Sequence, residues 1–218
     1  MNAGELKQAR LKRGYNQGEA AARAGVTQAY FSMLENGRRA PSSELARKLM
    51  RLYGLAPTAL PVSDLPGRVS PDFWASELAS LGYPGFAHLA GRKRVNPASF
   101  LLTALAQPNL EARVAEALPW LVFRYPDMNF DWLVPQARMK NLQNRLGFAV
   151  TLARLAGRRE NLAPFERVLG ESKLEKQDSF CKELTEPERR WLQEHSSPEA
   201  RQWNLLSDLG PNVLRYVG

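Results

Sequence analysis

The residues best suited to covalent or metal chemistry are few and widely spaced in this sequence. Cys181 is the single cysteine among 218 residues, which excludes a disulfide framework and every multi-cysteine zinc or iron–sulfur site. The two histidines, His88 and His195, lie far apart in the chain. A Cys181/His195 nucleophile pair stays open but is disfavoured, because a predicted helix start separates the two residues. We therefore expect no enzyme activity, no metal and no cofactor.

Positive charge is concentrated near the N-terminus. Thirty Lys and Arg against 22 Asp and Glu give a formal net charge of +8. Residues 1–60 hold ten basic and four acidic residues, whereas residues 61–218 hold 20 and 18. A compact basic module is the expected footprint of a nucleic-acid binder, because each neutralised phosphate releases condensed counterions. A basic surface that serves solubility explains the charge alone equally well.

The elements that must position these charges are helical. Capping side chains precede helix-compatible segments throughout the chain, several with proline at the first helical position: Asn16, Thr27, Ser70-Pro71, Asn96-Pro97, Asn109, Thr185 and Ser197-Pro198. Runs rich in Val, Ile and Thr that alternate with a period of two are missing. The sequence therefore predicts an all-α protein.

A proline-rich stretch divides the chain. Residues 55–71 contain four prolines and no sustained helical pattern. This predicts an N-terminal domain at residues 1–60, a linker at 61–70 and a helical bundle of six or seven helices at 71–218. Its longest pattern, residues 135–157, predicts one central helix whose apolar side chains are Met139, Leu142, Leu146, Val150 and Leu155. The aromatic cluster at Trp120, Phe123 and Tyr125 is typical of a core.

Residues 16–41 have the spacing of a helix-turn-helix. Asn16 begins a helix whose small alanines let another helix approach closely, and Gly25 stands where a tight turn needs a positive φ. Thr27 then begins a helix in which Phe31 and Leu34 face inward. Two helices joined by a short glycine-containing turn form this motif.

Residues 4–60 resemble the Cro/lambda-repressor-like helix-turn-helix family, also called the XRE family. The matching positions are Arg10, Gln17, Ala21, Gly25–Thr27, Ser32, Leu34–Arg39 and Pro41, with apolar Leu45, Leu49 and Leu52 after them. The resemblance implies a five-helix DNA-binding domain. The sequence departs from the family at Gly18 and Ala20, where a glutamate and a leucine are common, so we expect looser packing of the second helix.

The family resemblance also implies a role for individual residues. Base contacts in the major groove fall to the start and outer face of the recognition helix: Gln28, Ala29, Tyr30 and Met33. Phosphate contacts fall to residues at the helix ends and just beyond them: Gln17, Thr27, Asn36, Arg38 and Arg39. Arg10 and Glu35 form a structural ion pair. Two alternatives stay open: Gln17 and Gln28 as solvated residues, and Tyr30 and Met33 as packing residues.

These features predict a cytoplasmic transcriptional regulator, specifically a repressor, that binds double-stranded DNA as a homodimer. One recognition helix reads few base pairs, so two copies are needed for useful affinity. Residues 71–218 would dimerise the protein or bind a protein partner. The alternative is an antitoxin that neutralises a toxin and represses its own operon, an analogy of domain order. No apolar run approaches the ~18 residues needed to span a bilayer, so we expect no membrane association.

Overall fold

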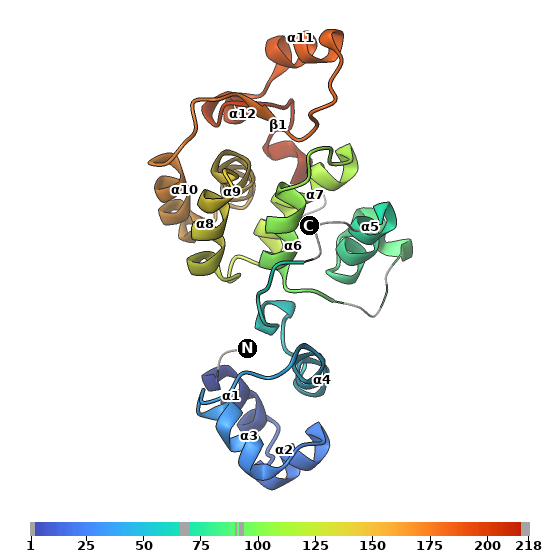
Figure 1. Cartoon of the computed structure of the whole chain (residues 1–218), viewed down its shortest axis with the longest axis vertical. Coiled ribbons are helices and arrows are strands. Elements are labelled where there is room, and N and C mark those ends of the chain that lie inside the picture. Colours follow the sequence, from blue (N-terminus) through green and yellow to red (C-terminus); the bar gives the residue numbers. More distant parts are fainter. Residues whose placement is uncertain (1–2, 66–69, 90, 92–93, 215–218) are drawn as a thin grey trace. The chain divides into compact units, whose positions relative to one another are not determined.

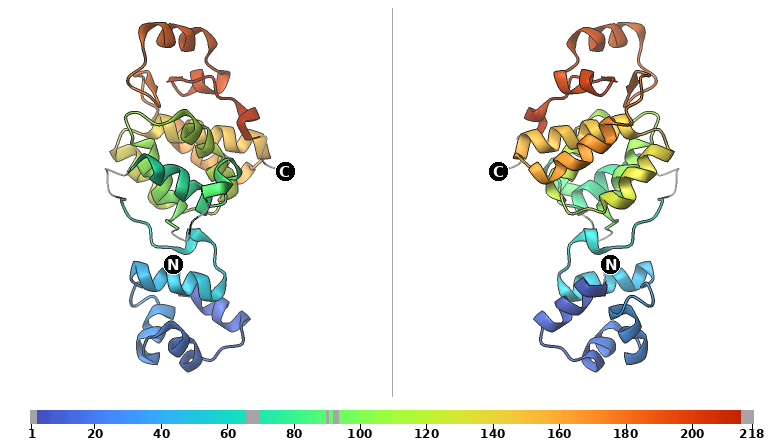
Figure 2. Two further views of the ribbon diagram at one scale, coloured as in Figure 1. Left: turned by 90° about the vertical axis from the view of Figure 1, so that its right-hand side faces the viewer. Right: turned by 90° about the vertical axis from the view of Figure 1, so that its left-hand side faces the viewer.

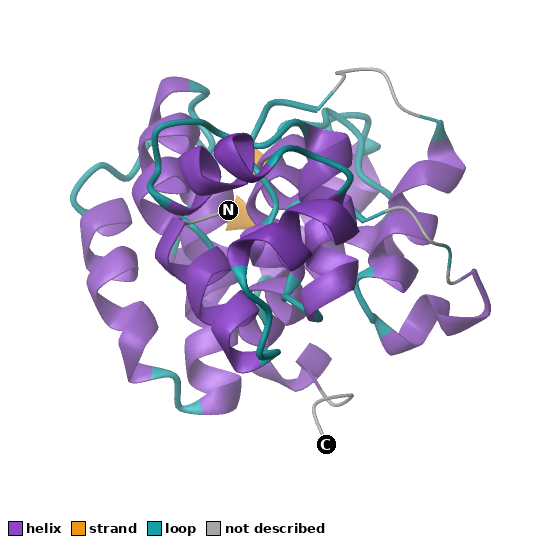
Figure 3. Cartoon of the chain, turned by 90° about the horizontal axis from the view of Figure 1, so that it is seen from below, coloured by secondary structure: helices purple, strands orange, loops and turns teal. Residues whose placement is uncertain are grey.

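The computed structural model describes residues 3–65, 70–89, 91 and 94–214, which fall into two compact units (Figures 1 and 2). Unit 1 comprises residues 1–63 and 94–96, and unit 2 comprises residues 64–93 and 97–218. Nearly all of the regular secondary structure in the described residues is helical, as Figure 3 shows. The predicted all-α class is confirmed. No helix among the described residues is long and apolar enough to cross a membrane.

The described part of unit 1 contains four α-helices and one short 3-10 turn: α1 (Ala3–Lys12), α2 (Gln17–Ala24), α3 (Gln28–Glu35), α4 (Ser43–Tyr53) and η1 (Pro57–Ala59). The fifth helical element of this domain is thus a single 3-10 turn. Asn96 supports it from a distant part of the chain, because its Nδ2 donates to the carbonyls of Thr58 at 3.1 Å and Leu60 at 2.6 Å.

Unit 2 consists of short helices around α9, together with one small sheet. Its α-helices are α5 (Pro71–Ser80), α6 (Pro97–Leu105), α7 (Ala112–Arg124), α8 (Phe130–Met139), α9 (Gln143–Gly157), α10 (Ala163–Gly170), α11 (Glu186–His195) and α12 (Pro198–Gln202). The 3-10 turns are η2 (Pro84–Leu89), η3 (Glu160–Leu162) and η4 (Pro211–Leu214). Strands β1 (Asp178–Ser179) and β2 (Leu205–Leu206) pair in parallel. Every residue of α9 from Gln143 to Ala153 is buried, so this helix forms the centre of the unit.

The prediction of one central helix over residues 135–157 is wrong. The chain turns between α8 and α9, where Asn141 adopts a left-handed conformation with φ of 56° that asparagine tolerates better than most residues. Leu142 is still buried, so the apolar pattern continues across the turn and conceals it. Met139 and Leu155, both predicted to face the core, are 77% and 41% exposed. The break adds one helix to the predicted number. The described part of unit 2 has eight α-helices, whereas six or seven were predicted.

The sequence predicted that Asn109 caps a helix, and this prediction is wrong. Helix α7 begins later, with Glu111 at its N-cap position. The Oδ1 of Asn109 instead accepts hydrogen bonds from the backbone N–H groups of Lys182 at 2.9 Å and Glu183 at 3.3 Å. Its capping chemistry is used on a segment far along the chain.

The aromatic cluster of α7 belongs largely to the core. Trp120 and Tyr125 are buried, and the Tyr125 hydroxyl donates to the carbonyl of Leu81 at 2.7 Å. Packing around α9 is also close. A Cβ on Gly147 would lie 2.3 Å from ring atoms of Trp203, so a side chain at this position would displace the indole.

Candidate nucleic-acid interface

Two local features set the geometry of α2 and the turn that follows it. Asn16 and Glu19 form a reciprocal capping box, in which each side chain accepts the other's backbone N–H, at 2.8 and 2.9 Å. Gly25 ends α2 with φ of 75°, a conformation that costs little only for glycine. Val26 then packs against the core of unit 1. The turn is therefore fixed before α3 begins.

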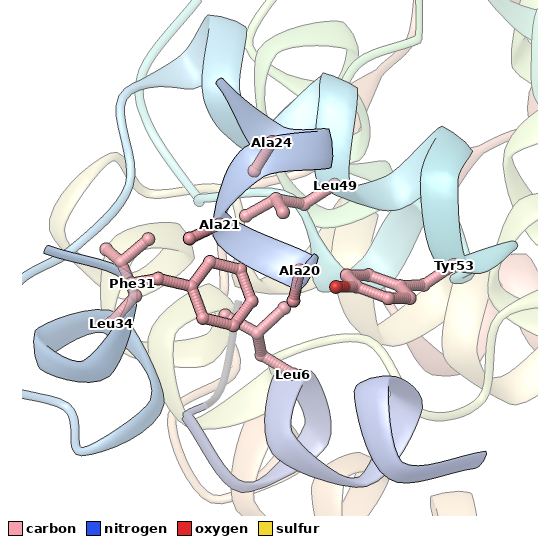
Figure 4. Packing of buried hydrophobic residues seen from close by; sticks show 8 residues of the cluster. All are labelled: Leu6, Ala20, Ala21, Ala24, Phe31, Leu34, Leu49 and Tyr53. Carbon is pink, nitrogen blue, oxygen red and sulfur yellow. The ribbon is translucent and has the colours of Figure 1, made fainter. Parts of the chain in front are cut away.

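Helix α3 has one buried face and one free face. Thr27 caps it by accepting the Tyr30 N–H at 3.2 Å. Phe31 and Leu34 are buried among the alanines of α2 (Figure 4). On the other side Gln28 and Ala29 are exposed. A helix held on one face by a packed core presents the other to solvent in a fixed orientation.

A buried ion pair connects α1 with the end of α3. Arg10 Nε donates to Glu35 Oε1 at 2.6 Å and Arg10 Nη2 donates to Oε2 at 3.2 Å, while Nη1 donates to the carbonyl of Tyr15 at 2.7 Å. The hydrogen bonds to Glu35 raise the pKa of Arg10 above its ordinary value. The side chains of Arg10 and Glu35 are 9% and 1% exposed, so the pair is a structural element of the domain.

The small residue at position 20 is matched by a large one on α4. Ala20 is fully buried, and Figure 4 shows the ring of Tyr53 directed toward it, with Leu6 on the other side. Burial, with a smaller contribution from the nearby Glu35 carboxylate, raises the pKa of Tyr53. The expected looser packing of α2 is thus offset, because Tyr53 takes up space beside Ala20.

Sequence comparisons identify this unit. Residues 6–60 match the family model described as "Helix-turn-helix". The N-terminal module is a helix-turn-helix domain. A relative in Bacillus subtilis (strain 168), named as an uncharacterized HTH-type transcriptional regulator YqaF, is 43% identical over 49 residues. That match covers 22% of this chain and 64% of the relative, so the chain matches less than two thirds of its length. No solved structure matches the chain significantly.

The helix-turn-helix domain places the predicted base-contacting residues in different environments. Gln28 and Ala29 are exposed at the start of α3, and Met33 is 40% exposed one turn further on. Tyr30 is half-buried and packs against the core of the domain. A Cβ on Gly18 would lie 3.9 Å from Gln28 Oε1, which places the Gln28 amide beside the first turn of α2. Of the four residues, Gln28, Ala29 and Met33 are therefore exposed, and Tyr30 is the one that is half-buried.

The predicted phosphate-contacting residues are likewise divided. Arg38 and Arg39 are exposed beyond α3, and neither forms an ion pair with any residue that the structure describes. Gln17 and Asn36 already use their amides within the domain: Gln17 Nε2 donates to Glu35 Oε2 at 2.8 Å, and Asn36 Nδ2 donates to the carbonyl of Ser32 at 2.9 Å. The Thr27 hydroxyl caps α3. Among the five predicted phosphate contacts, Arg38 and Arg39 are the two whose side chains form no hydrogen bond or ion pair with a described residue.

Helix α4 carries three exposed basic residues that were not among the predicted DNA contacts. Arg47, Lys48 and Arg51 are exposed, and Lys48 Nζ lies 2.9 Å from the position of a Cβ on Gly25. Their spacing of three and four residues is the signal that places them near one another on a helix. They add three exposed positive charges to the helix-turn-helix domain, and Lys48 carries one of them to the turn between α2 and α3.

The residues considered for metal or nucleophile chemistry do not gather in one place among the residues described. No group of three His, Cys, Asp or Glu side chains there is placed to hold a metal ion. Cys181 and His195 are engaged separately: Cys181 Sγ contacts Asn109 Oδ1 at 3.7 Å, whereas His195 stacks on Trp191 with ring centroids 4.4 Å apart. Each of the two side chains is therefore engaged with a partner other than the one that a nucleophile pair requires.

Proposed function

We propose that this chain is a sequence-specific DNA-binding transcriptional regulator. The observation that carries the proposal is the free face of α3, which presents exposed, uncharged Gln28, Ala29 and Met33 from a helix fixed by its cap, its turn and its core. A helix of eight residues is about 12 Å long and fits the major groove of B-DNA. The helix-turn-helix family match and the name of the Bacillus subtilis relative support the same function.

In this proposal Gln28 reads a base edge. A carboxamide can donate and accept together at adenine N6 and N7, which neither a cation nor a hydrocarbon can do. Ala29 offers a methyl group to thymine, and Met33 provides an adaptable apolar contact. Tyr30 contributes less, because part of its ring is committed to the core.

Phosphate contacts would orient the domain without reading sequence. Arg38 and Arg39 supply charge just beyond α3. Gln17, Thr27 and Asn36 supply dipoles at helix ends, and Gln17 keeps a second amide N–H for a phosphate while the first binds Glu35. The +6 charge of residues 1–60 would make affinity fall steeply with salt.

We further propose that the protein acts in the cytoplasm as a homodimeric repressor. One α3 spans ~4–5 base pairs, so two copies about one helical turn apart are needed for a specific site. A dimer bound in this way occupies a length of DNA that an RNA polymerase would otherwise use. Unit 2 is the part of the chain available for dimerisation.

Selection of bound sequences from a random DNA pool, followed by titration of two variants, tests this function. Gln28→Ala should weaken binding to the selected site by about 10–100-fold, or ~1–3 kcal/mol, with little effect on a random duplex. Arg38→Ala should weaken both duplexes alike. Equal losses for Gln28→Ala on the two duplexes would remove the base-reading role, and failure to enrich any sequence would remove specific binding.

An antitoxin is the second candidate function. Large apolar side chains exposed on unit 2, among them Leu89, Met139 and Trp191, favour a protein partner for residues 71–218. The test is size-exclusion chromatography of the protein isolated from its own host, together with inspection of the adjacent reading frame. A lone dimer with no adjacent partner gene would refute the antitoxin function and leave the regulator function standing.

A further inference from the structure

Unit 2 contains a cleft lined by an excess of positive charge. Its volume is about 760 Å³, within the range of about 300–1,000 Å³ that is usual for small-molecule sites. Five basic side chains line it against the acidic Glu175 and Asp178: Lys140, Arg145, Lys176, Lys182 and Arg189. Residues 61–218 are nearly neutral as a whole. The cleft therefore gathers positive charge, and acidic residues elsewhere in this part of the chain offset it.

Arg145 and Asp178 form a rigid part of the cleft wall and neutralise each other. Arg145 Nε and Nη2 donate to the two carboxylate oxygens of Asp178 at 2.7 and 2.9 Å. Nη1 donates to the carbonyls of Leu105 and Gln107, both at 2.8 Å, and Nη2 also donates to the carbonyl of Ser179. Since all of its nitrogens are used, Arg145 shapes the cleft and leaves ligand contacts to other side chains.

A second polar clamp holds the segment that carries Lys176. Asn144 Nδ2 donates to the carbonyl of Leu174 at 2.9 Å, and Asn144 Oδ1 accepts the N–H of the same residue at 2.8 Å. Asn204 Nδ2 donates to the Leu174 carbonyl as well, at 2.8 Å. Because these buried or half-buried amides fix the wall, the cleft exists before any ligand binds.

Four cations are left after Arg145 is set aside. Lys176, Lys182 and Arg189 form no ion pair or side-chain hydrogen bond with any residue that the structure describes. Lys140 lies 3.7 Å from Asp64, a pair in which both side chains are exposed and which therefore contributes little. The carboxylate of Glu175 opposes them, and the amides of Asn141 and Gln177 add hydrogen-bond donors to the lining.

We propose that this cleft binds a small anionic ligand that carries two or more phosphate or carboxylate groups. The cations come from three separate segments: the α8–α9 turn, the chain from Lys176 to Lys182, and α11. A monovalent anion would leave most of them without a partner, whereas a polyanion can bridge them. The proposal does not depend on the DNA-binding function, because every lining residue belongs to unit 2.

Calorimetric titration of the full chain with inorganic triphosphate and with citrate tests the proposal. At about 150 mM salt, where exposed charges are well screened, Lys176→Gln/Lys182→Gln should bind the preferred probe at least about tenfold more weakly than the unaltered chain. Two matched pairs serve as controls. Arg113→Gln/Arg190→Gln removes two exposed cations outside the cleft lining, and Arg38→Gln/Arg39→Gln removes two from the helix-turn-helix domain. Both should retain the original affinity.

Three outcomes would overturn the proposal. The first is absence of binding of either probe to the unaltered chain. The second is equal weakening in the cleft variant and a control variant, which would indicate diffuse surface charge. The third is a cleft variant that loses affinity for a random DNA duplex but keeps its affinity for both probes, which would make the cleft a nucleic-acid surface. Thermal unfolding of Lys176→Gln/Lys182→Gln, monitored by tryptophan fluorescence, should match that of the unaltered chain. This would show that the loss of probe affinity comes from the cleft and not from a change in the fold.

Discussion

Replacement of Glu35 by glutamine should destabilise the helix-turn-helix domain strongly. Glu35 accepts two hydrogen bonds from Arg10 and one from Gln17, and its side chain is 1% exposed. Glu35→Gln keeps the shape but leaves the Arg10 guanidinium buried without a counter-ion, a change that costs about 3–5 kcal/mol. A unit of this size has a total stability of about 3–9 kcal/mol. The loss is therefore a large fraction of the free energy of unfolding.

The distribution of tryptophans allows this loss to be measured in the full chain. All five tryptophans lie between Trp74 and Trp203, in unit 2, whereas unit 1 contributes four α-helices to the far-UV circular dichroism signal. In a urea titration, Glu35→Gln should lower the urea concentration at which the circular dichroism signal of unit 1 is lost. The midpoint of the tryptophan fluorescence transition, which reports on unit 2, should not change. The apolar double variant Arg10→Met/Glu35→Leu should recover most of the stability, because no buried charge remains. A loss below about 1 kcal/mol, or an equal shift of the fluorescence transition, would refute the reasoning.

Three further predictions concern stability. Arg145 holds the pKa of Asp178 below its usual value, although burial alone would raise it. Unit 2 should therefore lose stability as the pH falls below the unfolded pKa of about 3.9. Asp178→Asn should be less stable at neutral pH, and its free energy of unfolding, followed by tryptophan fluorescence, should depend less on pH. Gly25→Ala should cost about 1–2 kcal/mol in circular dichroism melts, because alanine resists a φ of 75°. Gly147→Ala should cost about 1–3 kcal/mol and alter the emission of Trp203, whose ring occupies the site of the new methyl group; an unchanged spectrum would contradict it.

Local signals in the sequence predicted much of unit 1. The caps at Asn16 and Thr27 and the turn at Gly25 depend on residues within a few positions of one another, and the structure has each of them. The hydrogen bond from Gln17 to Glu35 joins residues 18 positions apart. The sequence could therefore assign Gln17 to a helix start but could not show that its amide is already engaged.

Longer-range pairing explains what was missed in unit 2. Asn109 has the residue type of a cap, yet its partners are 73 and 74 positions away. The turn at Asn141 could not be detected from periodicity, because Leu142 and Leu146 continue the buried pattern on its far side. The cleft draws its lining from Ala106 to Arg189, so no short stretch of sequence contains it. When a hydrogen-bond partner is distant in sequence, the residue type predicts which bonds a side chain can form but not which residue it bonds to.

The support that Asn96 gives to η1 has a consequence for synthesis of the chain. The last residues of unit 1 that the structure shows in contact with its main segment are 94–96, whereas the parallel strand pair of unit 2 is completed only at Leu206. At translation rates of about 5–20 residues per second, the ribosome needs roughly 5–20 s to cover the interval between them. The helix-turn-helix domain can thus complete its fold on the nascent chain while the rest of unit 2 is still being synthesised.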